Sequence, residues 1–304
     1  MNKTSLFRVW IQAARLRTLP LSVAGILTGN ALALDRAGFS WIVFSGTLLT
    51  AVCFQILSNF ANDYGDGIKG TDNDDRIGPK RVLQQNLLSA AALFRGIVLT
   101  GIIGLLLAAV TIGTAFGMDQ LIPSAIFLLL ALASIWAAYR YTAGNRAYGY
   151  RALGDLFVLL FFGLLAVLGS YFLQTKTLSL TSLWFALAVG GLSVGVLNLN
   201  NMRDMENDTA VGKKTIAAIL GLVKAKRYHA ILLFLSVLAL TLGLSDMAQS
   251  NVQLLPILIV LPAAIQLRKT LNTTDFTLFD TQLKPLALAT FVLSVLLFVT
   301  QLMQ

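Results

Sequence analysis

The sequence has little charge, one cysteine and one histidine. Only 12% of its 304 residues are Asp, Glu, Lys or Arg, whereas soluble globular chains carry about 25%. The single Cys53 excludes an internal disulfide, and together with the single His229 it leaves too few ligands for a zinc site built from Cys and His. These shortages exclude a secreted disulfide scaffold, a disordered chain and an ordinary soluble enzyme.

Apolar residues make up 57% of the chain and form long uninterrupted runs. A membrane-spanning helix needs about 20 such residues. Nine runs are candidates, near residues 18–34, 41–62, 89–113, 121–139, 153–173, 182–202, 228–247, 254–267 and 285–302. We therefore predict an all-α membrane protein with about nine transmembrane helices in one bundle, forming a single domain over residues 1–304.

The basic residues are distributed unevenly among the loops. All of the 23 Lys and Arg residues except Arg36, Arg95 and Lys176 lie in alternate flanking segments, which are 1–17, 63–88, 140–152, 203–227 and 268–284. Loops rich in Lys and Arg stay on the cytoplasmic side of a membrane. We expect a cytoplasmic N-terminus, an outward C-terminus and chemistry at the cytoplasmic face.

The few acidic residues are concentrated in two short windows. Eight of the 14 lie within 63–75 and 204–208. The polar residues of each window recur at the spacing of one helix face: Asn59, Asn62, Asp63 and Asp66 in the first, and Asn201, Asp204 and Asp208 in the second. The two stretches, near 59–72 and 198–208, indicate a weak internal duplication that would bring two carboxylate clusters face to face across one cavity.

Carboxylates at the end of a membrane span are usually paired, bound to a cation or facing water. Oxygen ligands suit Mg²⁺, which commonly joins carboxylates to substrate phosphates. Basic side chains that bind phosphate are present in the same loops: Lys69, Arg76, Lys80, Arg81, Arg140, Arg146, Lys213 and Lys214. This combination favours a ligand with a diphosphate head and a lipid tail.

A simpler interpretation of these carboxylates is helix capping or surface charge. We disfavour it for the four residues at the span ends, Asp63, Asp66, Asp204 and Asp208. We favour it for Asp72, Asp74 and Asp75, which would form a solvated loop face paired with Arg76.

Asn62-Asp63-x-x-Asp66 together with Asp204-x-x-x-Asp208, at the ends of the second and sixth helices, resembles the UbiA superfamily of intramembrane prenyltransferases. Further strings are similar to its MenA branch, the 1,4-dihydroxy-2-naphthoate polyprenyltransferases: Arg17-Thr18-Leu19-Pro20, Gly78 to Gln85, Tyr141-Thr142-Ala143-Gly144 and Leu153-Gly154-Asp155. One position departs from the superfamily pattern, because Gly70 stands where a third Asp often occurs. Whether the next acid, Asp72, joins a metal site is therefore left open.

The resemblance implies a Mg²⁺-dependent enzyme in the cell inner (cytoplasmic) membrane, with its active site facing the cytoplasm. Asp63, Asp66, Asp204 and Asp208 would hold the metal. A polyprenyl chain would pass from polyprenyl diphosphate to 1,4-dihydroxy-2-naphthoate with loss of CO₂ and diphosphate, which gives demethylmenaquinone for menaquinone biosynthesis. Membrane lipid surrounds such a protein, and no nucleic acid is involved.

Several residues keep two interpretations each. Asn59, Asn62 and Asn201 could cap helix ends or support the metal site. Asp155 could pair with Arg151 or face the acceptor, and Arg17 could reach lipid headgroups or bind the acceptor carboxylate. Tyr139 and Tyr141 could belong to an interfacial belt or stabilise positive charge on the reacting allyl group.

Two rival functions remain at the level of sequence. A transporter would also carry intramembrane carboxylates and repeats, but its charges lie near the midplane, and here they lie at one end of the spans. A prenyltransferase of the same superfamily could instead use another aromatic acceptor, such as 4-hydroxybenzoate. Only the short sequences that are similar to the MenA branch argue against such an acceptor.

Overall fold

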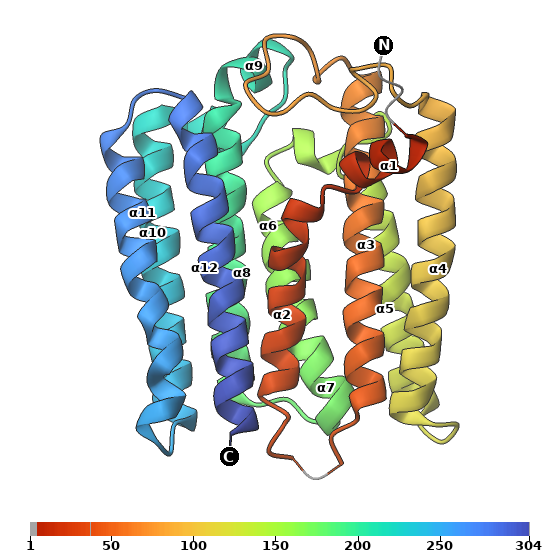
Figure 1. Cartoon of the computed structure of the whole chain (residues 1–304), viewed down its shortest axis with the longest axis vertical. Coiled ribbons are helices and arrows are strands. Elements are labelled where there is room, and N and C mark those ends of the chain that lie inside the picture. The colour runs from red at the N-terminus through yellow and green to blue at the C-terminus, as the bar shows by residue number, and fades with distance from the viewer. Residues whose placement is uncertain (1–4, 37, 304) are drawn as a thin grey trace.

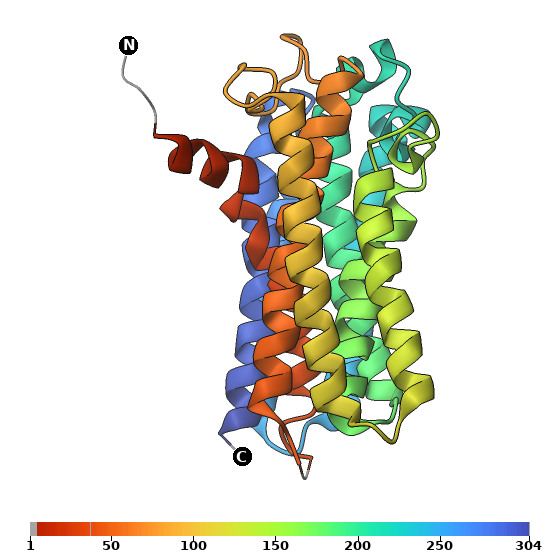
Figure 2. The ribbon, with the colours of Figure 1, turned by 90° about the vertical axis from the view of Figure 1, so that its right-hand side faces the viewer.

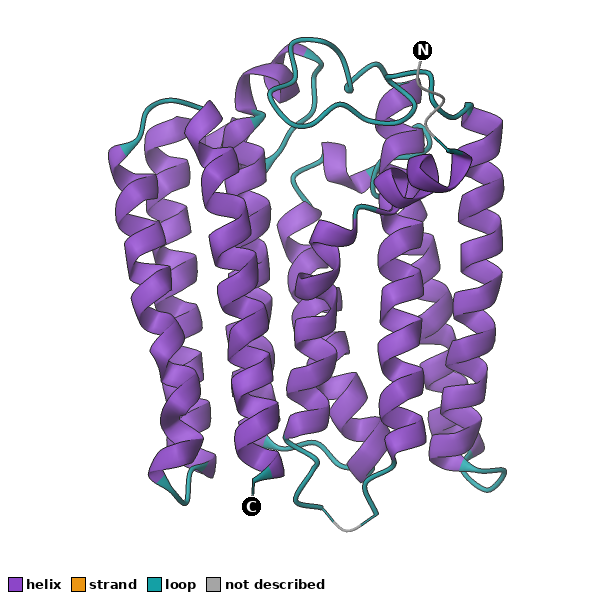
Figure 3. Cartoon of the chain, viewed as in Figure 1, coloured by secondary structure: helices purple, strands orange, loops and turns teal. Residues whose placement is uncertain are grey.

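The structure is a computed structural model that describes residues 5–36 and 38–303 as a bundle of parallel and antiparallel helices (Figure 1). Its helices are α1 (Leu6–Ala14), η1 (Leu16–Thr18), α2 (Leu19–Ala31), α3 (Trp41–Ile68), α4 (Ala90–Phe116), α5 (Leu121–Arg140), η2 (Tyr148–Tyr150), α6 (Gly154–Val158), η3 (Leu159–Gly169), α7 (Ser170–Thr175), α8 (Leu180–Arg203), α9 (Met205–Ala210), α10 (Ile216–Met247), η4 (Asn251–Ile259), α11 (Val260–Asn272) and α12 (Thr277–Leu302). Figure 3 shows helices and loops, and no strand, among these residues.

Eight helical stretches of the described chain are long and apolar enough to cross a membrane. They are α3, α4, α5, 154–175, α8, α10, 251–272 and α12. The prediction of an all-α, multi-pass membrane protein is confirmed. The remaining expected span, 18–34, contains α2, whose 13 residues fall short of the roughly 20 that span a bilayer. The count of nine spans therefore stays a prediction.

Helix ends in the structure differ from the ends of the apolar runs. α3 continues past residue 62 to Ile68, so the first acidic motif lies on the helix itself. α10 begins at Ile216 rather than near 228, with a break at Gly221, where φ is 71°. Backbone hydrogen bonding continues a helix into the polar region as long as side chains or water satisfy the last carbonyls. Hydropathy alone therefore places such ends too early or too late.

Small residues bring η3 close to its neighbours α2 and α8. A Cβ placed on Gly25 of α2 would lie 2.6 Å from the Ala166 side chain, and one on Gly163 of η3 would lie 2.7 Å from the Gly190 backbone of α8. Close backbone approach of this kind is how helices associate in a bilayer. By contrast α5 packs on α3 and α4, and space remains between α3, α5 and η3.

Three loop segments cover the upper end of the bundle in Figure 1, and we call this the motif end: residues 69–89, 141–153 and 204–215. Both acidic motifs lie there. Figure 2 shows α1 running out from the side of the bundle near this same end. The C-terminal residues of α12 lie at the opposite end (Figure 1).

Candidate functional site

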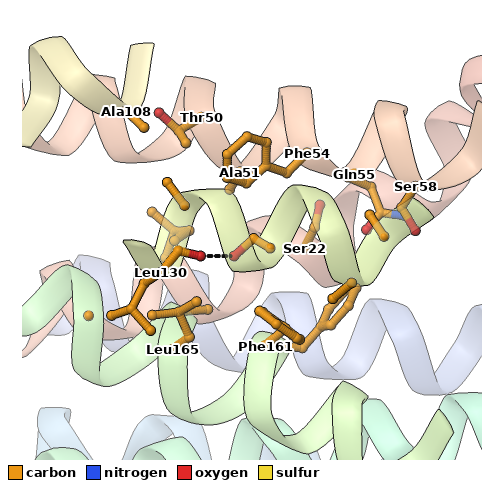
Figure 4. Close-up of a pocket in the computed structure, with 18 of the residues that line it drawn as sticks. Ser22, Thr50, Ala51, Phe54, Gln55, Ser58, Ala108, Leu130, Phe161 and Leu165 are labelled. Carbon is orange, nitrogen blue, oxygen red and sulfur yellow. Dashed lines mark hydrogen bonds between the residues drawn. The ribbon is translucent and has the colours of Figure 1, made fainter. Parts of the chain in front are cut away.

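A cavity of about 340 Å³ lies within the bundle. Its walls come from α2, α3, α4, α5, α6, η3, α7 and α8, together with Tyr141 and Tyr148. Figure 4 shows Thr50, Phe54 and Ser58 of α3 on one side, with Phe161 and Leu165 of η3 opposite them. Most of the lining is aliphatic or aromatic, which suits a hydrocarbon chain.

One end of the cavity reaches the first acidic motif. Asn62 lines the cavity, and the next residue, Asp63, lies buried among arginines. Asp63 forms an ion pair with Arg15, and Arg81 Nε lies 3.7 Å from Asp63 Oδ1. A buried carboxylate needs such compensation, because an unpaired buried charge is costly.

Asp72 is part of the same cluster, so its interpretation as a solvated loop residue was wrong. Its side chain is 1% exposed, with Oδ1 lying 3.5 Å from Arg76 Nε and 3.8 Å from Arg81 Nε. The chain turns sharply at Gly70, where φ is 70°, a conformation that glycine adopts without strain. This turn folds the loop back over the end of α3. Asp74 remains exposed, as expected.

The second acidic motif carries its own basic partners. Arg203 donates to both oxygens of Asp204, at 2.8 and 2.6 Å, and Lys213 Nζ lies 3.3 Å from Asp208 Oδ1. Burial favours a raised pKa for Asp204, but the hydrogen bonds and charge of Arg203 outweigh it and hold the pKa below its usual value. For Asp208, burial exceeds the opposing effect of Lys213 and raises the pKa to about 6.

Arg76 connects the two motifs. Its guanidinium lies 3.5 Å from Asp72 Oδ1 through Nε and 3.5 Å from Asp204 Oδ2 through Nη2. The structure therefore brings the two acidic stretches together, although Asn62 alone among their residues lines the cavity, so their arrangement across one cavity stays a prediction. A planar guanidinium between two acids is also suited to binding a diphosphate.

Hydrogen bonds fasten the three loop segments of the motif end to one another. Tyr150 Oη donates to Asp66 Oδ1 at 2.7 Å and contacts the hydroxyl of Thr71. Asn207 Nδ2 donates to the Thr71 carbonyl at 3.0 Å. The ammonium of Lys69 lies 4.1 Å from the centre of the Tyr150 ring. Asp66 and Lys69 are thus held beside the other acids.

The donor set fits a magnesium ion that arrives together with a phosphate. Asp72 Oδ2 and Asp208 Oδ2 are buried carboxylate oxygens without a hydrogen-bond partner in the described chain. No group of three Asp, Glu, His or Cys side chains within residues 5–36 and 38–303 is arranged as a ready metal site. Mg²⁺ at phosphate sites typically uses one or two carboxylates, completed by waters and substrate oxygens, so a preformed cage is not required.

Four predicted phosphate-binding or carboxylate-binding residues lie outside the cluster. Lys80 is exposed and pairs with Asp74 at 2.9 Å, and Arg17, Arg146 and Lys214 are also exposed. Long basic side chains at a membrane surface gain more from water and headgroups than from burial. Their positions therefore give no support to a direct role in the site.

The predicted residues Arg140 and Asn201 are partly or fully buried near the motif end. Arg140 lies against Gly144, where an added Cβ would come within 2.4 Å of Arg140 Nη1. Asn201 is 4% exposed on α8. Neither residue lines the cavity.

Tyr139 and Tyr141 lie in different environments in the structure. Tyr141 lines the cavity, whereas Tyr139 has its ring 6.5 Å from those of Tyr64 and Phe94, between α3, α4 and α5. Residues two apart on a helix point in different directions. Only Tyr141 is therefore placed to contact a reacting allyl group.

Asn59 is hydrogen-bonded to the segment that leads from α1 into α2, and it does not line the cavity. Its Nδ2 donates to the Ala14 carbonyl at 2.8 Å and to Thr18 Oγ1 at 3.0 Å, and its Oδ1 accepts from Gln55. Both hydrogens of its amide nitrogen are used by these neighbours. The structure thus gives Asn59 a positioning role for the segment between α1 and α2.

Asp155 is not paired with Arg151 and does not line the cavity. Its carboxylate accepts a hydrogen bond of 2.9 Å from Tyr228 of α10. Arg151 is exposed and is not its partner. Gly154 and Phe157 line the cavity but Asp155 does not, because α6 turns its side chain toward α10. Contact with an acceptor in the cavity is therefore not supported.

Sequence reasoning missed several residues of the site. Arg15 was one basic residue among many before the first span, and Arg203 directly precedes Asp204, a charge pattern that could have indicated the pair. The aromatic residues Tyr148, Phe157 and Phe161 line the cavity. Their spacing across η2, α6 and the π-helix η3 has no periodicity that a sequence scan would detect.

Comparison with known proteins decides the family. The model of the UbiA prenyltransferase family matches residues 22–277. The chain belongs to the UbiA prenyltransferase family. The predicted relationship is thus confirmed.

This family member is similar to curated proteins named 1,4-dihydroxy-2-naphthoate octaprenyltransferase. The protein from Escherichia coli (strain K12) is 44% identical over 77% of this chain and 76% of its own length. The one from Mycobacterium tuberculosis (strain ATCC 25618 / H37Rv) is 36% identical over 79% of each chain.

Solved structures share the fold at low sequence identity. A UbiA homolog from Aeropyrum pernix K1 superposes with a TM-score of 0.70 at 17% identity, covering 95% of this chain and 98% of that one. A UbiA homolog from Archaeoglobus fulgidus bound to DMAPP and Mg²⁺ gives 0.67 at 14% identity, covering 95% and 99%.

Proposed function

We propose that this family member transfers a polyprenyl chain from polyprenyl diphosphate to 1,4-dihydroxy-2-naphthoate, with release of diphosphate and CO₂, to give demethylmenaquinol, the reduced form of demethylmenaquinone. The observation that carries the proposal is an apolar cavity that reaches Asn62 of the first acidic motif, which Arg76 joins to the second motif. The names of the curated relatives support the naphthoate acceptor, and the homolog bound to DMAPP and Mg²⁺ supports a prenyl diphosphate and a divalent metal.

The cluster at the motif end would bind the diphosphate head. Asp63, Asp66, Asp204 and Asp208 would hold Mg²⁺, with Asp72 as a further ligand supported by its unpartnered Oδ2. Bound Mg²⁺ supplies Lewis-acid stabilisation of the charge that develops on the leaving diphosphate.

Basic residues would share that charge. Arg76, Arg81 and Lys213 already lie within 4 Å of acidic oxygens, and each could turn toward a phosphate oxygen once metal neutralises its acidic partner. In the absence of substrate, these same pairs compensate the buried carboxylates.

The prenyl tail would lie in the cavity with its first carbon near Asn62. Tyr141 lines the wall there, and an aromatic face stabilises positive charge on the allyl group as diphosphate leaves. The apolar walls keep water from that carbon, which would otherwise be hydrolysed. The naphthoate ring attacks at its carboxylated carbon, and loss of CO₂ restores its aromaticity.

We place the enzyme in the inner membrane with its active site facing the cytoplasm, surrounded by membrane lipid. The support is the concentration of Lys and Arg in the segments of the motif end. The soluble acceptor would then enter from the cytoplasm and the lipid substrate from the bilayer.

Purified protein in lipid nanodiscs tests the activity. It is incubated with Mg²⁺, a polyprenyl diphosphate and either 1,4-dihydroxy-2-naphthoate or 4-hydroxybenzoate, and product, CO₂ and diphosphate are measured. We expect one CO₂ and one diphosphate per prenylated naphthoquinol, and no turnover after chelation of the metal. Efficient prenylation of 4-hydroxybenzoate with naphthoate inert would overturn the proposed acceptor.

A further inference from the structure

The part of the cavity nearest the acidic motifs has two unlike walls. On α3, Gln55, Ser58 and Asn62 follow one another at i, i+3 and i+7, which places them on one helix face. Tyr148 and Phe157 also line the cavity, and they form one stack with Phe161, which Figure 4 shows on the side opposite α3. Figure 4 shows Gln55 and Ser58 together at one end of the cavity.

The aromatic wall is rigid. The rings of Tyr148 and Phe157 are stacked, with centroids 3.8 Å apart and planes 20° apart, and Phe161 continues the stack at 6.0 Å from Phe157. Tyr148 Oη donates to the Ala137 carbonyl at 2.8 Å, which fixes its ring. A preformed flat aromatic face binds another flat ring without loss of side-chain entropy.

The polar wall keeps hydrogen-bonding capacity for a ligand. Gln55 donates through Nε2 to Thr18 and Asn59, and its carbonyl Oε1 has no partner among residues 5–36 and 38–303. The Ser58 hydroxyl likewise makes no hydrogen bond with the described residues, although it lines the cavity. Both can accept a hydrogen bond from a phenolic hydroxyl.

Distance along α3 separates this region from the diphosphate site. Ser58 lies one helical turn, about 6 Å, below Asn62 and two turns, about 12 Å, below Asp66. Deeper still, at Ala51 and Thr47, the wall of α3 carries no further amide. The polar row is therefore level with the first units of a bound prenyl chain.

We infer that the slot between this polar row and the aromatic wall is the acceptor site, and that Phe157, Ser58 and Gln55 select a bicyclic dihydroxy ring. The inference rests on the proposed function. The two fused rings pack on Phe157, and the ring hydroxyls donate to Ser58 and Gln55. A single-ring acceptor covers less of the aromatic wall and places only one hydroxyl on the polar row, so it binds more weakly.

Kinetics of Phe157→Leu and Ser58→Ala in nanodiscs test the assignment, with KM measured separately for each substrate. Loss of the aromatic face raises KM for dihydroxynaphthoate about five- to tenfold, and loss of the serine hydroxyl raises it about fivefold. KM for the polyprenyl diphosphate stays unchanged. Phe157→Tyr, which keeps the ring face, recovers most of the naphthoate affinity.

Matched controls separate this effect from damage to the fold. Phe234→Leu, at an exposed position, and Ser124→Ala, at a half-buried one, make the same chemical changes outside the cavity, and both retain wild-type KM values. Thermal unfolding of every variant shows whether it is folded. Mg²⁺-dependent binding of farnesyl S-thiolodiphosphate, an unreactive analogue, shows whether the diphosphate site of each variant is intact.

Three results overturn the assignment. Equal increases in KM for both substrates place the prenyl tail, not the acceptor, on Phe157. Unchanged KM for naphthoate in a folded Phe157→Leu variant places the ring elsewhere. If the wild-type protein binds the thiolodiphosphate but does not turn over naphthoate, the proposed acceptor itself is wrong, and this outcome is separate from the first two.

Discussion

At the scale of single residues, the site is a network of buried opposite charges. Asp63, Asp72, Asp204 and Asp208 are buried and each has at least one basic partner, and Arg76 serves acids of both motifs. The sequence located the acids because charged residues are scarce in this chain. It did not locate the pairing, because partners such as Arg15 and Asp63 are far apart in the sequence and their contact depends on how loops fold over the helix ends.

Asp72 and Asp74 give a matched pair of neighbours for a first prediction. Asp72→Asn should lower turnover at least about tenfold, because it removes a buried charge that faces Arg76 and Arg81. Asp74→Asn, on an exposed side chain, should leave turnover within about twofold of wild type. Turnover of naphthoate is measured for both, and equal losses would show that general loop charge matters rather than the buried cluster.

Arg76 supports a second prediction. Arg76→Gln leaves Asp72 and Asp204 each with one fewer positive partner, and removal of one member of a buried ion pair costs about 3 kcal/mol. We expect a lower unfolding temperature and a higher KM for the polyprenyl diphosphate. Lys80→Gln, at an exposed ion pair, is the control. A variant at Arg76 that behaves like the control would contradict a bridging role.

At the scale of helices, hydropathy predicted most of the spans but not their ends. The apolar run near 41–62 predicted a helix that continues to Ile68, and the run near 228–247 predicted a helix that starts at Ile216. The π-helix η3 also had no sequence signal, because its hydrogen-bond register depends on packing against α2 and α8. Its inward side nevertheless forms much of the cavity wall.

The contact between η3 and α8 carries a third prediction. At Gly163 a Cβ would lie 2.6 Å from the Ala186 carbonyl oxygen and 2.7 Å from Gly190 Cα. Gly163→Val should therefore push η3 from α8, lower the unfolding temperature and reduce turnover. Gly113→Val on α4, where an added Cβ meets nothing within 4 Å, should change neither by a comparable amount. Unfolding temperatures from tryptophan fluorescence decide the question, and equal stability of the two variants would refute close packing at Gly163.

At the scale of the whole molecule, the protein has an apolar interior and a charged end. The membrane class could be predicted from composition alone, whereas the cavity could not, because it depends on the gap between α3, α5 and η3. The orientation of the bundle comes from the distribution of Lys and Arg.

Orientation gives a fourth prediction. In a Cys53→Ala background, a cysteine at Met118, an exposed position at the end opposite the motifs, should react with an impermeant thiol reagent added outside cells. A cysteine at Lys69, at the motif end, should react only after the membrane is permeabilised. The reverse pattern would place the acidic motifs outside and contradict the proposed entry of the acceptor from the cytoplasm.

The central claim is that both acidic motifs together hold Mg²⁺ and a prenyl diphosphate at the mouth of the cavity. The most direct measurement is equilibrium binding of farnesyl S-thiolodiphosphate to wild type, Asp63→Asn and Asp204→Asn, with and without Mg²⁺. Wild type should bind only with Mg²⁺, and each variant should lose at least about tenfold in affinity, because charge-assisted contacts contribute about 1.5 to 3 kcal/mol each. Binding that is independent of Mg²⁺, or unchanged when either motif is altered, would contradict the account.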